Sequence, residues 1–164
     1  MQQRSVIHST FVIERSYPVT PARVFAAFAD PAQKRRWFAG ERAMTLEEFE
    51  MDFQVGGREH TRSRFREGSP FPGTALANHT TYQDIVPDRR IVLAYTMTLG
   101  DRRISASLAT IELVPTADGT SLVFTEQGAY FEGADGPDIR ERGWEGLLDS
   151  LGASLLQPAS AHQG

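Results

Sequence analysis

Glu126 is the residue best placed for chemistry, because it shares a strand face with two hydrophobic side chains. It follows Leu122 and Phe124 at a spacing of two, so it points inward if they do. One interpretation pairs its carboxylate with an arginine such as Arg15 or Arg58, or leaves it in water at the mouth of a cavity. The other makes it an acceptor that orients a ligand or, with a raised pKa, a general base.

Four histidines are scattered along the chain, and His8 and His162 lie near its ends. A metal site would need His60 and His79 to converge with a carboxylate, and we expect surface or hydrogen-bonded histidines instead. Cysteine is absent, which excludes disulfides and thiolate chemistry. The sequence also lacks a G-x-S-x-G elbow, a P-loop, a G-x-G-x-x-G turn and an H-E-x-x-H motif. We therefore expect no catalytic residue, metal or cofactor.

Methionine and aromatic residues recur at alternate positions of two expected strands. These positions are Phe49, Met51 and Phe53 in one strand and Ile91, Leu93, Tyr95 and Met97 in the other. Such residues are typical of a core, but Met adapts to irregular shapes and Tyr has a polar tip, which also suits a cavity wall. Trp37 and Trp144 allow the same two interpretations, as packing residues or as flanks of an entrance.

The N-terminal elements that must position these residues are a strand and two short helices. The stretch STFVIERSY is rich in β-branched and aromatic residues and ends at a proline, as a strand does. Thr20-Pro21 and Asp30-Pro31 each supply an N-cap side chain and a proline at the first helical position. We expect a strand over 9–17 and helices over 21–29 and 31–39, the last ending at Gly40.

Period-two patterns then continue to about residue 131 and predict six further strands. They cover residues 49–53, 58–66, 75–86, 91–99, 104–114 and 121–131. Short turns join most of them, and Asp118-Gly119 suits a hairpin. The stretch EGSPFPG, residues 67–73, is the clearest loop. Seven strands in sequence with short turns predict an antiparallel meander.

The last element is a long helix that begins at Gly136-Pro137. Its hydrophobic residues recur at spacings of three and four: Ile139, Trp144, Leu147, Leu148, Leu151 and Leu155. Charged residues fall largely on the other side: Arg140, Glu141, Glu145 and Asp149. Roughly 20 residues give about 30 Å of helix, enough to cross a small domain.

Three glycines interrupt this helix, at a cost of about 1 kcal/mol each relative to alanine. They are Gly143, Gly146 and Gly152. Close approach of the helix to the sheet would favour them, and so would space left for a ligand.

In this order the elements resemble the START-like superfamily, also called SRPBCC or polyketide-cyclase-like, and within it the branch named after the activator of the heat-shock chaperone ATPase. The resemblance is carried by TFVIER (10–15), VF (24–25), Asp30-Pro31, Trp37-Phe38, DFQVGG (52–57), YQDIVP (82–87), RIV (90–92), GTSL (119–122), Gly143-Trp144, Leu148 and Leu151. It implies an α+β helix-grip fold, with a seven-stranded curved antiparallel sheet around a long C-terminal helix and two short helices after the first strand. The domain would cover residues 9–157, between tails at 1–8 and 158–164.

This scaffold implies an internal cavity, so we expect binding of a small hydrophobic molecule such as a lipid, a polyketide or an aromatic metabolite. The expected ligand contacts are Met51, Phe53, Tyr95, Phe124, Glu126, Trp144, Leu147, Leu148 and Leu151. Two alternatives stay open: a cyclase- or hydrolase-type enzyme that uses the Glu126 carboxylate, and a chaperone-associated or stress-related interaction module. Family members that act as chaperone cofactors carry a separate N-terminal client domain, whereas this sequence begins a few residues before its first expected strand.

The composition of the chain indicates which kinds of partner and which cellular compartment to expect. A formal net charge of −4 argues against nucleic-acid binding, and no apolar run approaches the ~20 residues of a membrane span. Since cysteine and a signal h-region are both absent, we expect a cytoplasmic protein. We allow for a homodimer because twofold dimers are the commonest oligomers.

Overall fold

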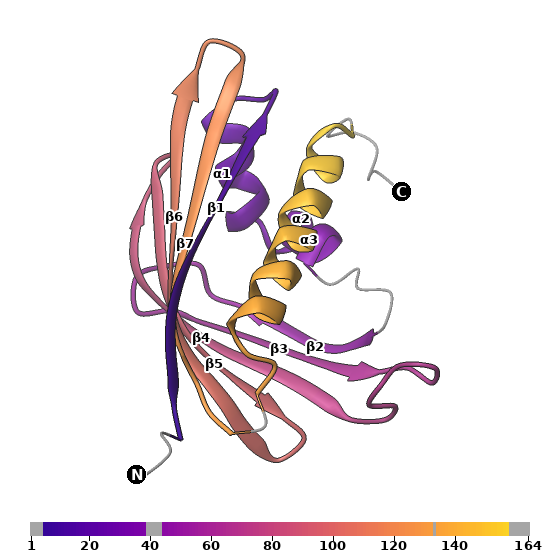
Figure 1. The fold of residues 1–164 in the computed structure, drawn as a ribbon. Helices are drawn as coiled ribbons and strands as arrows, with labels where there is room; N and C mark the ends of the chain where they lie inside the picture. The colour runs from indigo at the N-terminus through magenta and orange to yellow at the C-terminus, as the bar shows by residue number, and fades with distance from the viewer. Residues whose placement is uncertain (1–4, 39–43, 133, 158–164) are drawn as a thin grey trace.

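The chain forms a strongly curved antiparallel sheet with three helices on its inner side (Figure 1). The computed structural model describes residues 5–38, 44–132 and 134–157. The elements are β1 (Ile7–Tyr17), α1 (Pro21–Ala29), α2 (Pro31–Phe38), β2 (Met44–Met51), β3 (Arg58–Phe65), β4 (Ala75–Val86), β5 (Arg90–Leu99), β6 (Arg102–Thr116), β7 (Gly119–Tyr130) and α3 (Pro137–Leu155). This arrangement confirms the predicted helix-grip fold. Within the described ranges, no helix is both long enough and apolar enough to cross a membrane.

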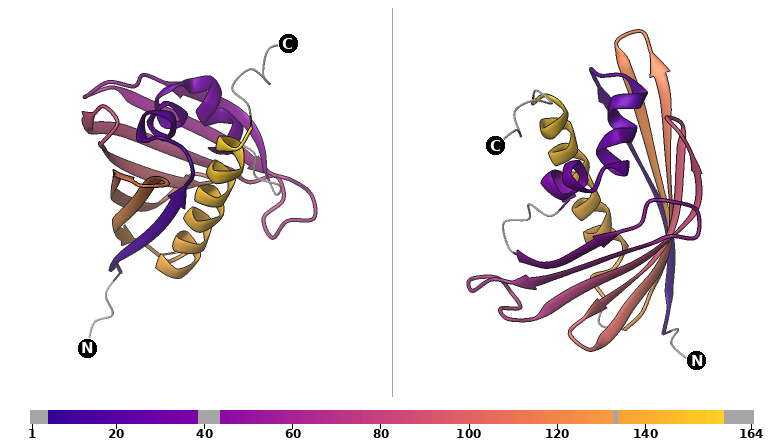
Figure 2. Two further views of the ribbon diagram at one scale, coloured as in Figure 1. Left: turned by 90° about the horizontal axis from the view of Figure 1, so that it is seen from above. Right: turned by 180° about the vertical axis from the view of Figure 1, so that it is seen from behind.

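The order of strands in the sheet is β1-β7-β6-β5-β4-β3-β2. Strands β2 to β7 form the expected meander, but β1 lies beside β7, at the opposite edge from β2. The connection explains this, because α1 and α2 carry the chain across the inner side of the sheet (Figure 2). Strand β1 also begins at Ile7 rather than Ser9, because Ile7 and His8 pair with Tyr130 and Ala129 of β7.

The two short helices begin as the sequence predicts. The Thr20 hydroxyl accepts a hydrogen bond from the Arg23 backbone N–H at 3.2 Å, and the Asp30 carboxylate accepts one from Ala32 at 3.0 Å. The expected end of α2 at Gly40 lies outside the described residues. Strand β2 ends at Met51, so Phe53 lies beyond it rather than within it.

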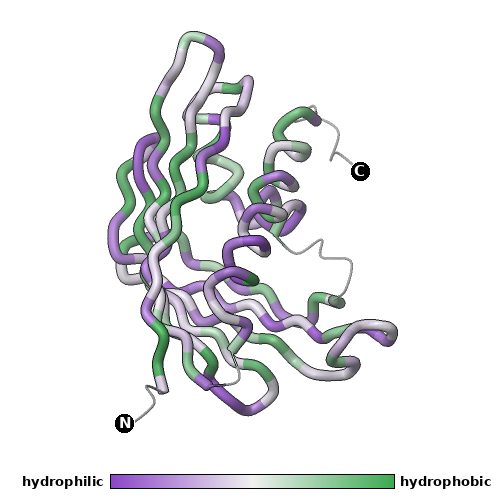
Figure 3. The backbone as a smooth tube through the Cα atoms, in the orientation of Figure 1, coloured by the Kyte–Doolittle hydropathy of each residue, from purple (hydrophilic) through white to green (hydrophobic). Residues whose placement is uncertain are grey.

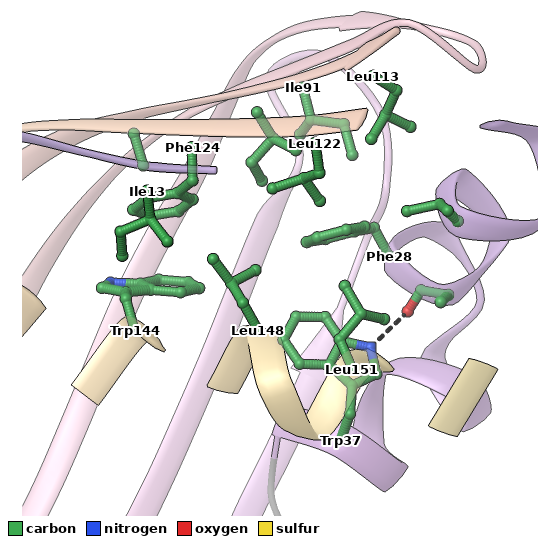
Figure 4. Packing of buried hydrophobic residues seen from close by; sticks show 14 of the residues in the cluster. Ile13, Phe28, Trp37, Ile91, Leu113, Leu122, Phe124, Trp144, Leu148 and Leu151 are labelled. Carbon is green, nitrogen blue, oxygen red and sulfur yellow. Dashed lines mark hydrogen bonds between the residues drawn. The ribbon is translucent and has the colours of Figure 1, made fainter. Parts of the chain in front are cut away.

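A single hydrophobic core fills the space between the sheet and the helices. Hydrophobic and hydrophilic positions alternate along the strands, as expected for a sheet with one covered face (Figure 3). Trp37 packs edge-on against Phe28, with ring centroids 5.0 Å apart, and donates its indole N–H to the Ala27 carbonyl at 2.9 Å (Figure 4). Because Trp37 is only 1% exposed, it is a packing residue and does not flank an entrance.

Helix α3 runs along the inner side of the sheet, and the elements nearest to it are β1, α1 and α2 (Figures 1 and 2). Leu148 and Leu151, in its C-terminal half, are completely buried against these elements (Figure 4). The N-terminal half of α3 faces the inner side of the strands from β2 to β6, and the candidate site lies there.

Candidate functional site

An open cavity of about 600 Å³ lies between the N-terminal half of α3 and strands β2 to β6. Most of its lining is apolar: Phe38, Met44, Phe65, Pro70, Phe71, Leu76, Met97, Leu99, Ile104, Ala134, Ile139, Gly143, Trp144 and Leu147. The polar and charged residues of the lining are Thr61, Ser63, Asn78, Tyr95, Asp135 and Arg140. Volume and composition are both typical of a small-molecule site.

Glycines decide where α3 leaves room and where it packs closely. Gly143 lies four residues after Ile139 and four before Leu147, so all three face the cavity, and a Cβ at Gly143 would meet no heavy atom within 4 Å. A Cβ at Gly152 would lie 3.0 Å from the Tyr17 ring, whose hydroxyl donates to the Leu148 carbonyl at 2.8 Å. Gly152 therefore allows the close approach that was expected, and Gly143 borders open space, whose use by a ligand stays a prediction.

Glu126 is completely buried and lies behind Tyr95, a residue of the cavity lining. The hydroxyl of Tyr95 donates to its Oε1 at 2.7 Å, that of Tyr130 donates to its Oε2 at 3.2 Å, and Nη1 of Arg140 lies 3.7 Å from Oε2. The arginine partner is thus Arg140, and the expectation of Arg15 or Arg58 was wrong. Arg15 bonds Asp149 instead, at 2.9 Å.

Arg140 was expected on the charged side of α3, and the structure corrects this. Its side chain is only 4% exposed. Residue 140 is one helical turn before Trp144 and two before Leu148, so it continues the buried face of the helix. The spacing of four and eight residues from Trp144 and Leu148 is the signal in the sequence that indicates this position.

Asp135 neutralises the buried Arg140 guanidinium. It accepts hydrogen bonds from Nε and Nη2 of Arg140, both at 2.9 Å. Burial lowers the pKa of Arg140, but Tyr95, Asp135 and Glu126 outweigh it and hold that pKa above its ordinary value. Burial raises the pKa of Glu126 despite opposing contributions from Tyr95, Arg140 and Tyr130.

The Tyr95 hydroxyl connects this cluster to the cavity and uses its full hydrogen-bonding capacity. It donates to Glu126 and accepts from Nη1 of Arg140 and from the indole N–H of Trp144, both at 3.2 Å. Burial, and then the nearby Glu126 carboxylate, raise the pKa of the Tyr95 phenol, so it keeps its proton. The cluster therefore holds Tyr95 and Trp144 in fixed orientations at the cavity surface.

A second buried ion pair fixes α2 to the sheet. Nζ of Lys34 lies 2.6 Å from Oε1 of Glu59, which also accepts a hydrogen bond from the Tyr82 hydroxyl, and Nζ lies 4.7 Å from the centre of the Phe38 ring. Burial, followed by the nearby Glu59, raises the pKa of the Tyr82 phenol. This pair positions Phe38 in the cavity lining.

The expected ligand contacts fall into separate places. Tyr95, Trp144 and Leu147 line the cavity, whereas the described lining does not include Met51, Phe53, Phe124, Glu126, Leu148 or Leu151. Phe53 packs edge-on against Phe25 and Tyr82, with ring centroids 5.6 and 5.0 Å apart, and Met51 lies opposite Glu59. Phe124, Leu148 and Leu151 belong to the core. Contact of these residues with a ligand stays a prediction.

The cavity residues of β3 and β4 could not be recognised from the sequence pattern. Strand β3 (REHTRSRF) is polar on both faces, so its alternation gave no indication of which side points inward. Thr61 and Asn78 are cross-strand partners and both face the cavity. Only the pairing of the strands places them there.

His60 and His79 converge, as a metal site would require, on the outer face of the sheet. Their Nδ1 atoms lie 3.1 Å apart, and Nε2 of His60 lies 2.9 Å from Glu48 Oε2. The two Nδ1 atoms face each other, and Glu48 is at the far nitrogen. No cluster of three metal-binding side chains occurs in the described part of the chain. Burial, together with the charges of His60 and Arg103, lowers the pKa of His79.

A model of the family described as activator of Hsp90 ATPase homolog 1-like protein matches residues 18–155. The chain belongs to this family. The match confirms the resemblance inferred from the sequence. A comparison of this Hsp90-ATPase-activator-homolog-like chain with curated proteins gave no match.

Solved structures similar to this family member come from bacteria. The Mll3558 protein from Rhizobium loti is 50% identical, with a TM-score of 0.81 over 92% of this chain and 99% of that one. A putative uncharacterized protein from Rhizobium leguminosarum is 39% identical, with a TM-score of 0.86 over 94% and 98% of the two chains. Protein CV1439 from Chromobacterium violaceum is 26% identical, with a TM-score of 0.73 over 91% and 99%. These likenesses extend over nearly the whole chain.

Proposed function

We propose that this protein binds a small, largely apolar molecule in the cavity between α3 and strands β2 to β6. The observation that carries the proposal is the cavity of about 600 Å³, most of whose lining residues are apolar. Its size falls within the range of sites that enclose drug-sized molecules. The fixed Tyr95 and Trp144 side chains would provide a rigid wall against which the ligand packs.

Binding is favoured over catalysis because of how the titratable groups are arranged. The Glu126 carboxyl lies behind Tyr95, and the described residues that line the cavity do not include it. A general base must reach the proton that it removes, directly or through one water. We therefore assign Glu126 the role of a positioning residue that orients Tyr95, and not that of a catalytic residue.

Filling the cavity tests the proposal. Gly143→Leu places a side chain in the open space, and it should weaken binding of the apolar fluorophore N-phenyl-1-naphthylamine about tenfold or more. Because leucine favours a helix more than glycine, the variant should also gain about 0.5 to 1 kcal/mol in free energy of unfolding. Fluorescence titration measures the binding, and urea unfolding measures the stability.

Gly146→Leu is the matched control. A Cβ at Gly146 also meets nothing within 4 Å, but Gly146 is not among the described cavity residues. This variant should gain similar stability and keep the affinity of the unaltered protein. The proposal is rejected if the unaltered protein does not bind the fluorophore, or if both variants affect binding equally. If the unaltered protein binds the fluorophore and only Gly143→Leu weakens the binding, native mass spectrometry of the purified protein would identify any ligand carried from the cell.

A further inference from the structure

Three uncharged polar side chains form a strip across the inner face of β3 and β4. Thr61, Ser63 and Asn78 all line the cavity, and Thr61 is the direct cross-strand partner of Asn78. Directly opposed residues on one face of an antiparallel pair have Cβ atoms about 4.5–5.5 Å apart. Thr61 and Asn78 can therefore reach the same atom of a bound molecule.

The hydroxyl of Thr61 has no hydrogen-bond partner within the described residues, although the residue is only 7% exposed. Nearly all buried polar groups in proteins are hydrogen-bonded, so an exception requires an explanation. The other such hydroxyl, that of Ser107, lies opposite Tyr95 on β6 and favours the charged form of the nearby Glu126 carboxyl, which lowers the pKa of that carboxyl, and Ser107 is not among the described residues that line this cavity. Thr61 is thus a cavity-lining residue with an unsatisfied hydroxyl whose oxygen is itself closed to solvent, so a ligand in the cavity would reach that oxygen after the side chain rotates about χ1.

The wall formed by α3 and β5 contrasts with this strip. Tyr95 donates one hydrogen bond and accepts two, and four donor contacts from Arg140 go to Asp135, Tyr95 and Ser105. Asp135 and Arg140 are the two charged residues of the described lining, and they pair with each other. No unpaired charge in that lining is available to a charged ligand, whose burial would be costly.

We propose that the ligand is an uncharged molecule with an apolar body and one hydroxyl or carbonyl oxygen that hydrogen-bonds to Thr61 and Asn78. This inference rests on the proposed function and specifies its ligand class. A threonine hydroxyl can donate to a carbonyl or accept from a hydroxyl, and the asparagine amide can do both. The strip thus selects a neutral polar group, and carboxylates and sulfonates bind poorly.

Matched probes test the inference by displacing N-phenyl-1-naphthylamine. The probes are 4-hydroxybiphenyl, 4-methylbiphenyl and biphenyl-4-carboxylate, which differ in one substituent. Thr61→Val removes the hydroxyl but keeps the shape of the side chain. It should weaken the binding of 4-hydroxybiphenyl roughly two- to tenfold relative to that of 4-methylbiphenyl, which is the range expected for the loss of one hydrogen bond. The carboxylate should bind about tenfold or more weakly than 4-hydroxybiphenyl.

Two further variants provide controls. Thr61→Ser keeps a hydroxyl and should preserve the ratio of the dissociation constants of 4-hydroxybiphenyl and 4-methylbiphenyl. Thr81→Val makes the same chemical change on the outer face of β4 and should leave the ratio unchanged. Because Thr61→Val removes an unsatisfied buried hydroxyl, its midpoint of urea unfolding should not fall below that of the unaltered protein.

The outcomes separate this inference from the proposed function. If the fluorophore binds but Thr61→Val leaves the ratio unchanged, the role of Thr61 is refuted and the binding function stands. Preferential binding of the carboxylate would refute the neutral ligand class. If the fluorophore does not bind the unaltered protein at all, the proposed function itself fails.

Discussion

The two halves of α3 belong to the same helix but have opposite surroundings. In the C-terminal half, Leu148 and Leu151 are completely buried and Gly152 allows Tyr17 to approach closely. In the N-terminal half, Ile139 and Gly143 face an open cavity, whose lining continues to Leu147 just past the middle of the helix. The contrast shows that one helix can support the core with one end and border an open cavity with the other.

Trp144 lies at the boundary between the two regions. One side of its indole packs against Phe124, with ring centroids 4.3 Å apart, and the residue also lines the cavity (Figure 4). Its N–H is held by Tyr95, which Glu126 orients in turn. We expect substitutions in the C-terminal half to change stability and those in the N-terminal half to change binding.

The largest expected effect is the loss of a leucine from the filled region. Leu151→Ala should lower the free energy of unfolding by about 2–5 kcal/mol, because it leaves a cavity in a packed core. Leu147→Ala removes the same atoms from a half-buried side chain at the open cavity, so it should cost less than about half as much. Urea unfolding followed by circular dichroism measures both. Equal losses would contradict the distinction between the two halves.

A pH titration tests whether Glu126 behaves as part of the buried region. A pKa raised in the folded state means that the folded protein binds this proton more tightly than the unfolded chain does. The contribution of Glu126 to stability is thus fully present below its ordinary pKa, and it is lost as the pH rises through the raised pKa. Glutamine does not titrate, so Glu126→Gln should become increasingly stable relative to the unaltered protein as the pH increases.

The size of this gain is about 1.4 kcal/mol for each unit by which the pKa is raised. Urea unfolding of both proteins between about pH 5 and about pH 8 gives the difference between their free energies of unfolding. The contributions of the other titrating groups are the same in both proteins and cancel in this difference. A difference that is constant with pH would mean that the Glu126 carboxyl has its ordinary pKa. The same variant tests the predicted role in ligand orientation, because unchanged affinity and selectivity would remove Glu126 from the site.

The smallest expected effect compares two glycines of α3. Gly146→Ala should increase the free energy of unfolding by about 0.5–1 kcal/mol, since alanine favours a helix and nothing lies within 4 Å. Gly152→Ala gains the same preference but presses on the Tyr17 ring, so it should be destabilising by about 1 kcal/mol. Thermal unfolding of the two variants shows whether each substitution stabilises or destabilises the protein. Stabilisation by Gly152→Ala would show that Tyr17 moves aside without cost.

Much of the fold could be predicted because its signals are local. The caps at Thr20 and Asp30 depend on side chains next to the helix start, and the period-two patterns of β4 and β5 depend on neighbours in sequence. The position of β1 beside β7 could not be predicted this way. It depends on where α1 and α2 carry the chain, which is a property of the whole sheet.

The sequence by itself determined the elements, their order and the hydrophobic face of α3, because these follow from propensity and periodicity. It also identified Glu126 as an inward-facing polar residue and predicted Tyr95 and Trp144 as ligand contacts. Only the tertiary structure brought Arg140 and Asp135 to Glu126 and placed Thr61 opposite Asn78 in the cavity. Contacts between distant segments depend on strand register and helix placement, and neither is encoded in the residues near the site.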